Sequence, residues 1–245
     1  MRETERAAID AEGARGDAAS RTGRVVDLVR AHIREGRLRP GDALPGEAAF
    51  ALRAGVSRPV AREAFRSLAA LGIVDTGNGR RPRVARVDSG VLGAVIDHAV
   101  TTDQMSPQQI FDVRRTVEGR IVALAAMRRA EEEARAIAEE AEGMRAAFDD
   151  PPAVMEHDLA FHRRLATASR NPLFALLIEG FAEATRQTWA VAWRARASDA
   201  ERLESVETHR AIAAAVAAQD AGAAVAAMND HFDHSVRALL AAGVR

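Results

Sequence analysis

Residues 54–68, which read Ala-Gly-Val-Ser-Arg-Pro-Val-Ala-Arg-Glu-Ala-Phe-Arg-Ser-Leu, decide how the first third of the chain folds. Ser57 is a preferred N-cap residue and Pro59 is tolerated in a first helical turn, so we expect a helix over residues 57–71. Apolar residues recur along it at helical spacing, and a row of arginines lines a neighbouring face. Such a helix suits a DNA groove, although a surface helix with solvated arginines has the same pattern. The arginines are Arg58, Arg62 and Arg66.

The composition narrows the class of protein. A chain of 245 residues is long enough for two modest domains, and the absence of cysteine excludes disulfides and thiolate metal sites. The net charge of −1 hides an asymmetry, because residues 20–87 hold 14 arginines and 6 acidic residues, whereas the rest of the chain holds 20 basic and 29 acidic ones. This imbalance indicates a nucleic-acid contact confined to the N-terminal part.

Two further expectations concern the N-terminus of the chain and the location of the protein in the cell. Residues 1–20 are polar and lack a clear apolar stripe, so we expect a disordered tail there. No apolar segment is long enough for a signal peptide or a membrane span, which predicts a cytoplasmic protein with no membrane partner.

The segments around residues 57–71 complete a helix-turn-helix. We expect a first helix at residues 22–35 and a short second helix at residues 47–54, after which Gly55 allows a tight turn. In such a motif the helix after the turn enters the major groove. Residues 73–84 then read as a β-hairpin with an arginine-rich tip, which is the wing of a winged helix-turn-helix.

These motifs resemble the winged helix-turn-helix of the GntR family of bacterial regulators. The similarity rests on Gly-Arg-Leu-Arg-Pro-Gly-Asp-Ala-Leu-Pro at residues 36–45, Val-Ser-Arg at 56–58, Arg-Glu-Ala-Phe-Arg-Ser-Leu at 62–68 and Gly-Ile-Val at 72–74. It places a DNA-binding domain at residues 21–86 and implies that the recognition helix and the wing contact DNA. The contacts that we predict are Ser57, Arg58, Arg62 and Arg66 of the helix, and Gly79, Arg80 and Arg81 of the wing.

One position departs from the family pattern. The family usually carries an arginine on the second helix, shortly after a Leu-Pro-Ser-Glu turn, but residues 44–48 read Leu-Pro-Gly-Glu-Ala. One expected DNA contact is therefore missing at Ala48, and Arg53 or the wing is the candidate substitute.

The remainder of the chain is almost entirely helical in pattern. We expect a linker at residues 87–104, in which Ser89 is placed to cap a short helix. Residues 105–245 then form an all-α antiparallel bundle of about six helices with short connections, so the whole protein is mainly α. The helices are expected at residues 107–130, 131–148, 153–169, 172–197, 200–218 and 221–242.

A group of potential metal ligands is spread over three of these helices. Asp158 and His162 lie four residues apart, which puts a carboxylate and an imidazole on one helix face, and His209 and His231 lie on separate helices. One oxygen and three imidazole nitrogens suit a divalent transition metal, with zinc as the first choice and nickel, manganese or iron as alternatives. His157 falls outside the pattern, as does His234, which is the alternative to His231.

The order of these segments resembles the FCD ligand-binding domain of the FadR branch of the GntR family. The similarity rests on Asp158 and His162 followed by Ser-Arg-Asn-Pro at residues 169–172, then on Glu-Thr-His-Arg-Ala-Ile at 207–212 and the segment ending at His231. It implies four metal ligands and a site for a small-molecule effector. The implied ligands are Asp158, His162, His209 and His231, and the candidate effector residues are Arg114, Trp193, Ser205 and Arg237.

The role of Arg114 has an alternative. By the resemblance, its guanidinium faces the metal and clamps a carboxylate of the effector. A structural ion pair with Glu118, four residues further on, would explain the same two residues. Trp193 likewise suits either the lining of a pocket or plain core packing.

Taken with this resemblance, the sequence predicts a dimeric transcription regulator rather than an enzyme. It would bind a pseudo-palindromic double-stranded operator, and a small organic acid coordinated to the metal would change its affinity for DNA. Two alternatives stay open: a metal-dependent hydrolase or isomerase using the Asp and His residues, and a regulator whose metal is purely structural.

Overall fold

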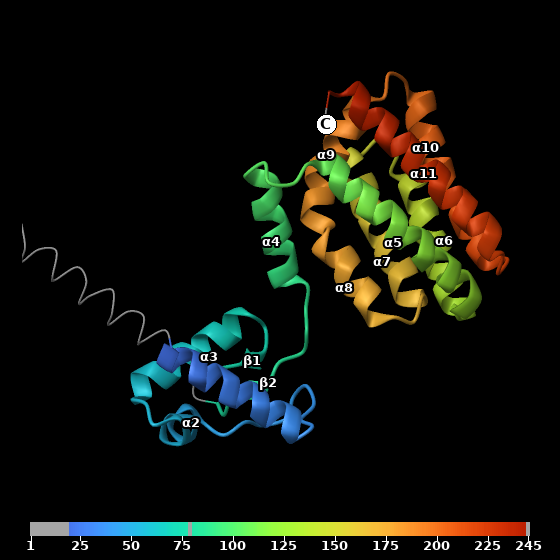
Figure 1. Cartoon of the computed structure of the whole chain (residues 1–245). Coiled ribbons are helices and arrows are strands. Elements are labelled where there is room, and N and C mark those ends of the chain that lie inside the picture. The colour runs from blue at the N-terminus through green and yellow to red at the C-terminus, as the bar shows by residue number, and fades with distance from the viewer. Residues whose placement is uncertain (1–19, 78–79, 244–245) are drawn as a thin grey trace, which may run out of the picture. The chain divides into compact units, whose positions relative to one another are not determined.

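The computed structural model describes residues 20–77 and 80–243. The chain divides into two compact units, the first ending at Val91 and the second beginning at Leu92 (Figure 1). In their described parts, the first unit holds three helices and a two-stranded sheet, and the second is built from helices alone. The prediction of a mainly helical protein, with a small β wing near its N-terminus and an all-α domain after it, is confirmed.

The first unit is the predicted helix-turn-helix with a wing. It contains a helix at residues 20–35, α2 (Glu47–Ala54) and α3 (Arg58–Ala70), followed by β1 (Val74–Asp75) and β2 (Arg83–Val84). The strands pair antiparallel, with Val74 opposite Val84. Apolar faces of the helices close over one small core, whose largest fully buried side chains are Phe50, Phe65, Leu44 and Leu68.

Glycine makes the turn between α2 and α3. Gly55 ends α2 with φ +64°, a left-handed conformation that costs glycine little, and its N–H bonds back to the last carbonyls of the helix. Ser57 is the N-cap residue of α3, as expected, although its side chain makes no capping hydrogen bond. The two predicted helices are therefore confirmed, the first at the expected bounds and the second within one residue at each end.

Two expectations fall wholly or mostly on parts of the chain that are not described. The disordered tail at residues 1–20 lies outside the described residues except for Ser20, which is already helical. Gly79, one of the predicted wing contacts, lies outside them as well.

The segment expected as a linker with a short helix, residues 87–104, contains the 12-residue helix α4 (Gly90–Thr101), which is longer than expected. Asp88, rather than Ser89, accepts a hydrogen bond from the N–H of Gly90 at 2.9 Å. One face of α4 is apolar and packs in a small cluster with residues of later helices, and this burial makes the segment part of the second unit. The cluster contains Leu92, Ile96, Val100, Ile110, Leu177, Phe181 and Ala184.

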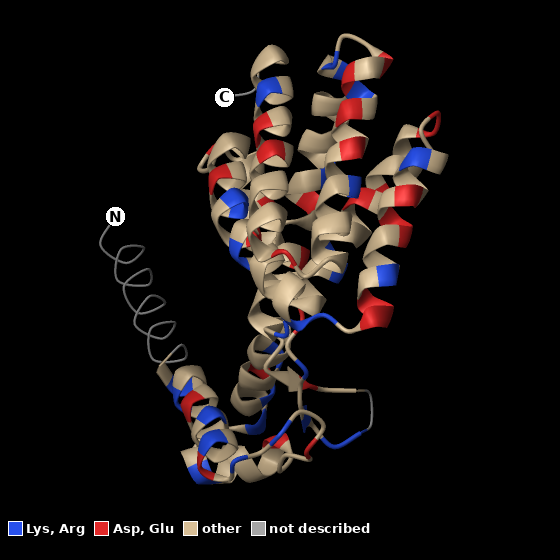
Figure 2. Cartoon of the chain, turned by 90° about the vertical axis from the view of Figure 1, so that its right-hand side faces the viewer, with Lys and Arg blue, Asp and Glu red and all other residues tan. Residues whose placement is uncertain are grey.

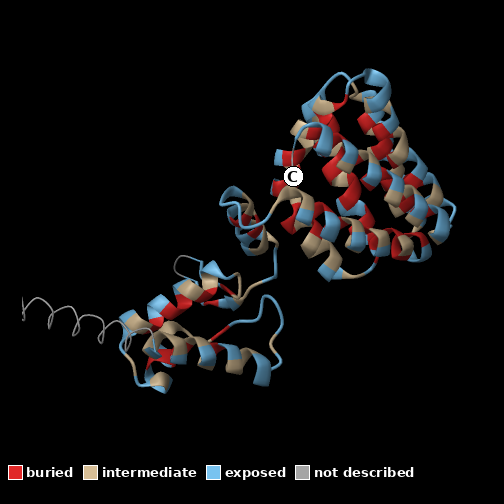
Figure 3. Ribbon diagram, turned by 45° about the horizontal axis from the view of Figure 1, so that its top comes forward, coloured by how far each residue is buried: buried red, intermediate tan, exposed pale blue. Residues whose placement is uncertain are grey.

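The bundle of the second unit follows the predicted order. Its helices are α5 (Pro107–Arg128), α6 (Glu131–Ala146), α7 (Pro151–Ala168), α8 (Pro172–Gly180), α9 (Ala182–Ala195), α10 (Asp199–Ala217) and α11 (Ala221–Ala241). Helix α5 packs on α11 and α7, and α6 packs on α7 and α10. Their buried residues face one another in the interior (Figure 3), around Phe161, Phe232, Ile121 and Met144.

The single helix expected at residues 172–197 is broken at Phe181 into α8 and α9. The break lies where α4 packs against the bundle. A Cβ atom at Gly180 would lie 2.7 Å from Cδ2 of Leu92, so any larger residue at this position would force Leu92 to shift. Helical periodicity alone does not reveal such a break, because both halves are apolar toward the same core.

Replacing Gly180 with alanine should destabilise the second unit. The added methyl group meets Leu92, and overpacking of this kind lowers the free energy of unfolding by about 1–3 kcal/mol. The control is Gly119→Ala in α5, where nothing lies within 4 Å of the new Cβ, so stability should rise by roughly 0.5–1 kcal/mol. Urea unfolding of both variants measures the difference. Equal stability of the two variants would contradict the packing of α4 on Gly180.

Candidate metal centre and nucleic-acid interface

Three histidines from three helices converge in the interior of the bundle. They are His162 of α7, His209 of α10 and His231 of α11, and each offers a ring nitrogen within 4.8 Å of the others. All three side chains are buried, and the ring centroids of His209 and His231 lie 4.4 Å apart. The predicted group of imidazoles is thus brought together by helices that are far apart in the sequence.

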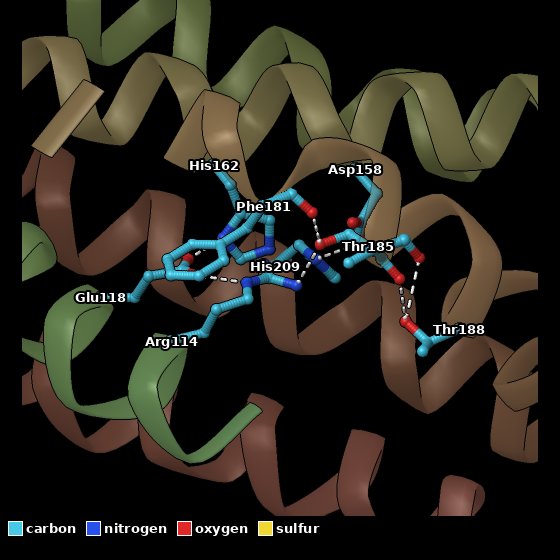
Figure 4. Close-up of polar contacts among 9 residues, drawn as sticks. Arg114, Glu118, Asp158, His162, Phe181, Thr185, Thr188 and His209 are labelled. Carbon is cyan, nitrogen blue, oxygen red and sulfur yellow. Dashed lines mark hydrogen bonds and ion pairs between the residues drawn. The ribbon is translucent and has the colours of Figure 1, made fainter. Parts of the chain in front are cut away.

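Asp158 joins the histidines from the turn of α7 that precedes His162 (Figure 4). Its Oδ1 lies 3.0 Å from Nε2 of His209, yet this nitrogen has no aligned hydrogen bond among the described residues. Neighbouring ligands of one metal ion, each about 2.1 Å from it, lie about 3.0–3.4 Å apart. The contact therefore has the spacing of two ligands that share a cation.

The protonation states of the cluster suit a cation as well. Burial alone would raise the pKa of Asp158, but the surrounding imidazoles outweigh burial and hold that pKa well below its usual range. Burial lowers the pKa of His231 well below its usual value, and the nearby His209 and His162 lower it further. The site thus offers an ionised carboxylate and a neutral imidazole, which are the forms that bind metals.

A second layer of polar groups orients the imidazoles. Nδ1 of His209 donates to the backbone carbonyl of Ser205 at 2.8 Å, which leaves its Nε2 free to act as a ligand. Nδ1 of His162 contacts the buried carboxylate of Glu118, whose other oxygen accepts a hydrogen bond from Nε of Arg114 at 2.8 Å. Burial would raise the pKa of Glu118, but Arg114 and His162 lower it overall, so this carboxylate is charged.

These residues fit a divalent transition metal. Besides Nδ1 of His162, which contacts Glu118, three ring nitrogens of the cluster are buried with no hydrogen-bond partner among the described residues, a costly state that a coordinated cation would relieve. They are Nε2 of His162, Nε2 of His209 and Nδ1 of His231. Three nitrogens and one carboxylate oxygen form a donor set that zinc, nickel, manganese and iron all accept.

The other two histidines of this unit that were singled out lie outside the cluster. His157 is partly exposed and contacts Glu140 at 2.8 Å, and His234 is partly buried with its Nε2 3.1 Å from Glu204. Geometry therefore favours His231 over His234 as the third imidazole.

The predicted effector residues are found in different surroundings. Arg114 is buried and makes the ion pair with Glu118 that the sequence left open as the alternative, and its Nη1 donates to Thr185 at 3.0 Å. Trp193 is buried and stacks on Trp189, with ring centroids 4.9 Å apart. The clamp predicted for Arg114 and the pocket role predicted for Trp193 both stay predictions.

Ser205 and Arg237 are connected through a residue that sequence reasoning missed. The hydroxyl of Ser205 accepts a hydrogen bond at 2.9 Å from Arg196, and Arg196 and Arg237 line one pocket of about 320 Å³. Arg196 follows the last residue of α9, where helical spacing no longer predicts direction, so no pattern in the sequence marked it. Glu118 was missed as a partner of His162 for a similar reason, because the contact joins different helices.

The predicted DNA-contacting residues that the structure describes are exposed, and arginines are frequent along the ribbon of the first unit (Figure 2). Arg58, Arg62 and Arg66 lie exposed on α3, and the described wing residues Arg80 and Arg81 are exposed as well. Ser57 is also exposed, at the start of α3. The predicted faces of α3 are thus confirmed, whereas contact with DNA by any one of these residues is still a prediction.

Nε of Arg62 lies 3.4 Å from Glu47 at the start of α2, and Arg66 pairs more loosely with Glu63 at 3.7 Å. Both pairs are solvent-exposed and therefore weak, so the guanidinium groups are free to exchange these partners for phosphates or bases. At position 48, where the family usually has arginine, Ala48 is exposed and offers no charge.

Comparison with known proteins identifies the family. The FCD domain family matches residues 109–234, and the family of bacterial regulatory proteins named gntR matches residues 21–84. The chain therefore belongs to the GntR family of transcriptional regulators, with an FCD domain after its helix-turn-helix. This pairing is consistent with the FadR branch, and these families contain regulators rather than enzymes.

Individual relatives are regulators as well. The chain is 31% identical over 207 residues to the HTH-type transcriptional regulator LutR of Bacillus subtilis, a match that covers 81% of this chain and 92% of LutR. It is 27% identical over 211 residues to the galactonate operon transcriptional repressor of Escherichia coli, covering 84% and 90%. The solved structure of Streptococcus agalactiae GntR shares the fold, with a TM-score of 0.64 at 24% identity over 88% of this chain and 98% of that one.

None of the helices that the structure describes combines the length and the apolar character that a membrane span requires.

Replacing Arg62 with alanine should weaken binding to a specific operator by about 1–3 kcal/mol, because a guanidinium in the middle of the recognition helix is placed to contact a base. The operator is first selected from a random DNA library, and affinities are then measured by fluorescence anisotropy. Arg135→Ala, which removes the same charge from an exposed position on α6, should leave the affinity unchanged. An unchanged operator affinity for Arg62→Ala would show that the recognition surface is misassigned.

Proposed function

We propose that this GntR-family regulator binds its operator as a dimer and responds to a small organic acid at a metal centre in the FCD domain. The observation that carries the proposal is the convergence of His162, His209 and His231 with Asp158 in a buried site. A cation held there would supply a positive centre to which a carboxylate of the effector coordinates.

The names of the relatives support an acid as the effector. The Escherichia coli relative is a repressor of the galactonate operon, and galactonate is a sugar acid. We infer the same broad class of effector for this chain, together with a cytoplasmic location and a repressor role. A divalent transition metal is part of the proposal, with zinc first among the candidates.

The dimer follows from the requirements of DNA recognition. A single recognition helix reads one half-site, and two related by a twofold axis read a pseudo-palindromic operator. The effector would regulate binding by favouring one arrangement of the two DNA-binding units over another, which requires that it binds the two arrangements with different affinities.

A purely structural metal is the second candidate. The cavity that borders His162, Arg114 and Thr185 measures about 10 Å³, which is room for at most one water molecule. A metal centre closed in this way would stabilise the bundle without binding an effector directly.

Metal analysis tests the donor set. We expect the purified protein to carry about one transition-metal ion per chain after supplementation, and both His162→Ala and His209→Ala to lose it, because each removes an imidazole from a buried site. His157→Ala is the matched control and should keep the metal, since His157 lies outside the cluster. Elemental analysis of the four proteins gives the result. Full metal content in both site variants would rule out this donor set.

Operator binding in the presence of organic acids tests the regulatory role. With metal-loaded protein, the right acid should change operator affinity by about 5- to 150-fold, the usual range of coupling between two sites. His209→Ala should keep basal DNA binding and lose this response. If chelation lowers the thermal stability but no acid in a broad library changes operator affinity, the metal is structural and the effector proposal is wrong.

A further inference from the structure

Arg62 is the arginine of α3 that is held from a different helix. Its Nε lies 3.4 Å from Oε2 of Glu47, the first residue of α2, and 15 positions separate the two in the sequence. Arg66 pairs with Glu63 of its own helix at 3.7 Å, and Arg58 has no ion-pair or hydrogen-bond partner among the described residues. The contact of Arg62 therefore depends on how α2 and α3 pack in the helix-turn-helix.

This contact uses one nitrogen of the guanidinium and leaves the other two unused. Glu47 faces Nε, and neither Nη1 nor Nη2 of Arg62 has a partner among the residues that the structure describes. A guanine presents two acceptors, N7 and O6, on its major-groove edge, and an arginine binds both through two N–H groups. Arg62 can thus bind a guanine with its Nη groups while Nε stays on Glu47, so the base does not have to displace the carboxylate.

Glu47 is well placed to hold this end of the Arg62 side chain. It lies in the first turn of α2, where the helix dipole favours a carboxylate, and it is partly buried. The residue that follows is Ala48, so no cation at that position competes for the carboxylate. Both the backbone position and the charge of Glu47 are therefore set by α2, independently of the recognition helix.

The pair is weak in the free protein and becomes stronger against DNA. In the free chain 58% of the Arg62 side chain and 35% of the Glu47 side chain are exposed, and an exposed pair of this kind changes an equilibrium by no more than about fivefold. When α3 enters the major groove, water is removed from around the two side chains, and an ion pair is stronger where the dielectric constant is lower. The contact therefore matters most in the complex with DNA.

A carboxylate at this position also opposes binding to the wrong sequence. Phosphates and the acceptor atoms of a base edge repel Glu47, so its charge is compensated in the complex only while Arg62 lies against it. A base that offers no pair of acceptors draws Arg62 elsewhere and leaves the carboxylate uncompensated. Glu47 should therefore weaken binding to wrong sequences more than binding to the right one, which is how repulsive groups produce specificity.

We propose that Glu47 determines operator specificity as a positioning residue, which holds Nε of Arg62 so that Nη1 and Nη2 read one guanine. Glu47 itself touches no base in this arrangement. Each half-site of the operator should then contain a G·C pair whose guanine lies against Arg62. This inference rests on the operator binding of the proposed function, and it is independent of the metal centre and of the effector.

Selection of DNA from a random library by the full chain identifies that base pair. Wild type and Arg62→Ala are selected in parallel, and the pair whose preference is lost in the variant is the one that Arg62 reads. We expect a G·C pair, which the wild type prefers over A·T about 5- to 150-fold. Fluorescence anisotropy with two operators that differ only at this pair then gives the ratio of their affinities. Because both operators are measured on one protein sample, the ratio does not depend on how much of the sample is folded.

Variants of Glu47 test the positioning role. Glu47→Ala removes the charge and the acceptor and should lower the ratio about two- to fivefold, whereas Glu47→Gln keeps an acceptor oxygen and should lower it less. Neither variant should bind random-sequence DNA more weakly than the wild type, since each removes a negative charge from a surface that faces phosphates. Glu63→Ala is the matched control, because Glu63 is an exposed carboxylate of the recognition helix that pairs with Arg66, and it should leave the ratio unchanged.

A double-mutant cycle separates positioning from direct contact. In the Arg62→Ala background, Glu47→Ala should have no further effect on the ratio, because the side chain that it positions is gone. A further loss in that background would show that Glu47 contacts the base pair itself and would overturn the inference.

The remaining outcomes separate this inference from the proposed function. An unchanged ratio in Glu47→Ala, or an operator on which Arg62→Ala changes no preference for guanine, would overturn the inference and leave operator binding intact. If the wild type enriches no sequence from the library, operator binding itself is wrong, and the inference is overturned with it.

Discussion

Burying ionised carboxylates and imidazoles inside an apolar bundle is the constraint on which the second unit depends. Asp158 and Glu118 are almost fully buried, and a buried charge is tolerated only when it is paired and hydrogen-bonded. The bundle meets this requirement with contacts that cross from helix to helix: Glu118 lies between Arg114 and His162, and Asp158 lies against His209. These contacts restrict how α5, α7 and α10 are rotated about their axes.

The polar interior also contains two buried arginines with different roles, and the sequence alone did not distinguish these roles. Arg114 lies over the rings of Phe111 and Phe232 and is bound to Glu118, so it stabilises the cluster. Arg196 has a single hydrogen bond to Ser205 and faces a pocket. Two buried guanidinium groups in one domain thus differ in what they offer, because one has a carboxylate partner and the other does not.

The DNA-binding unit is held together by apolar packing. Its helices share a small apolar core around Phe50 and Phe65, and that core leaves the charged face of α3 in solvent. Position along the helix decides which side chains are buried and which are exposed to solvent. The spacing of Arg58, Arg62 and Arg66 was therefore enough to assign them to the exposed face. The exposed pair of Arg62 with Glu47 is weak in the free protein.

Local sequence determined the parts of this protein that depend on neighbouring residues. Apolar periodicity, the N-cap at Ser57 and the glycine turn at Gly55 are local signals, and the helices α2 and α3 lie where those signals place them. Asp158 and His162 share a helix face for the same reason, and the resemblance to the FCD domain pointed to His209 and His231 as their partners. The contact of α4 with Gly180, the break at Phe181 and the positions of Glu118 and Arg196 were decided only by the tertiary structure. Each depends on a residue from another helix, and spacing within one helix carries no information about which side chain a distant helix will bring against it.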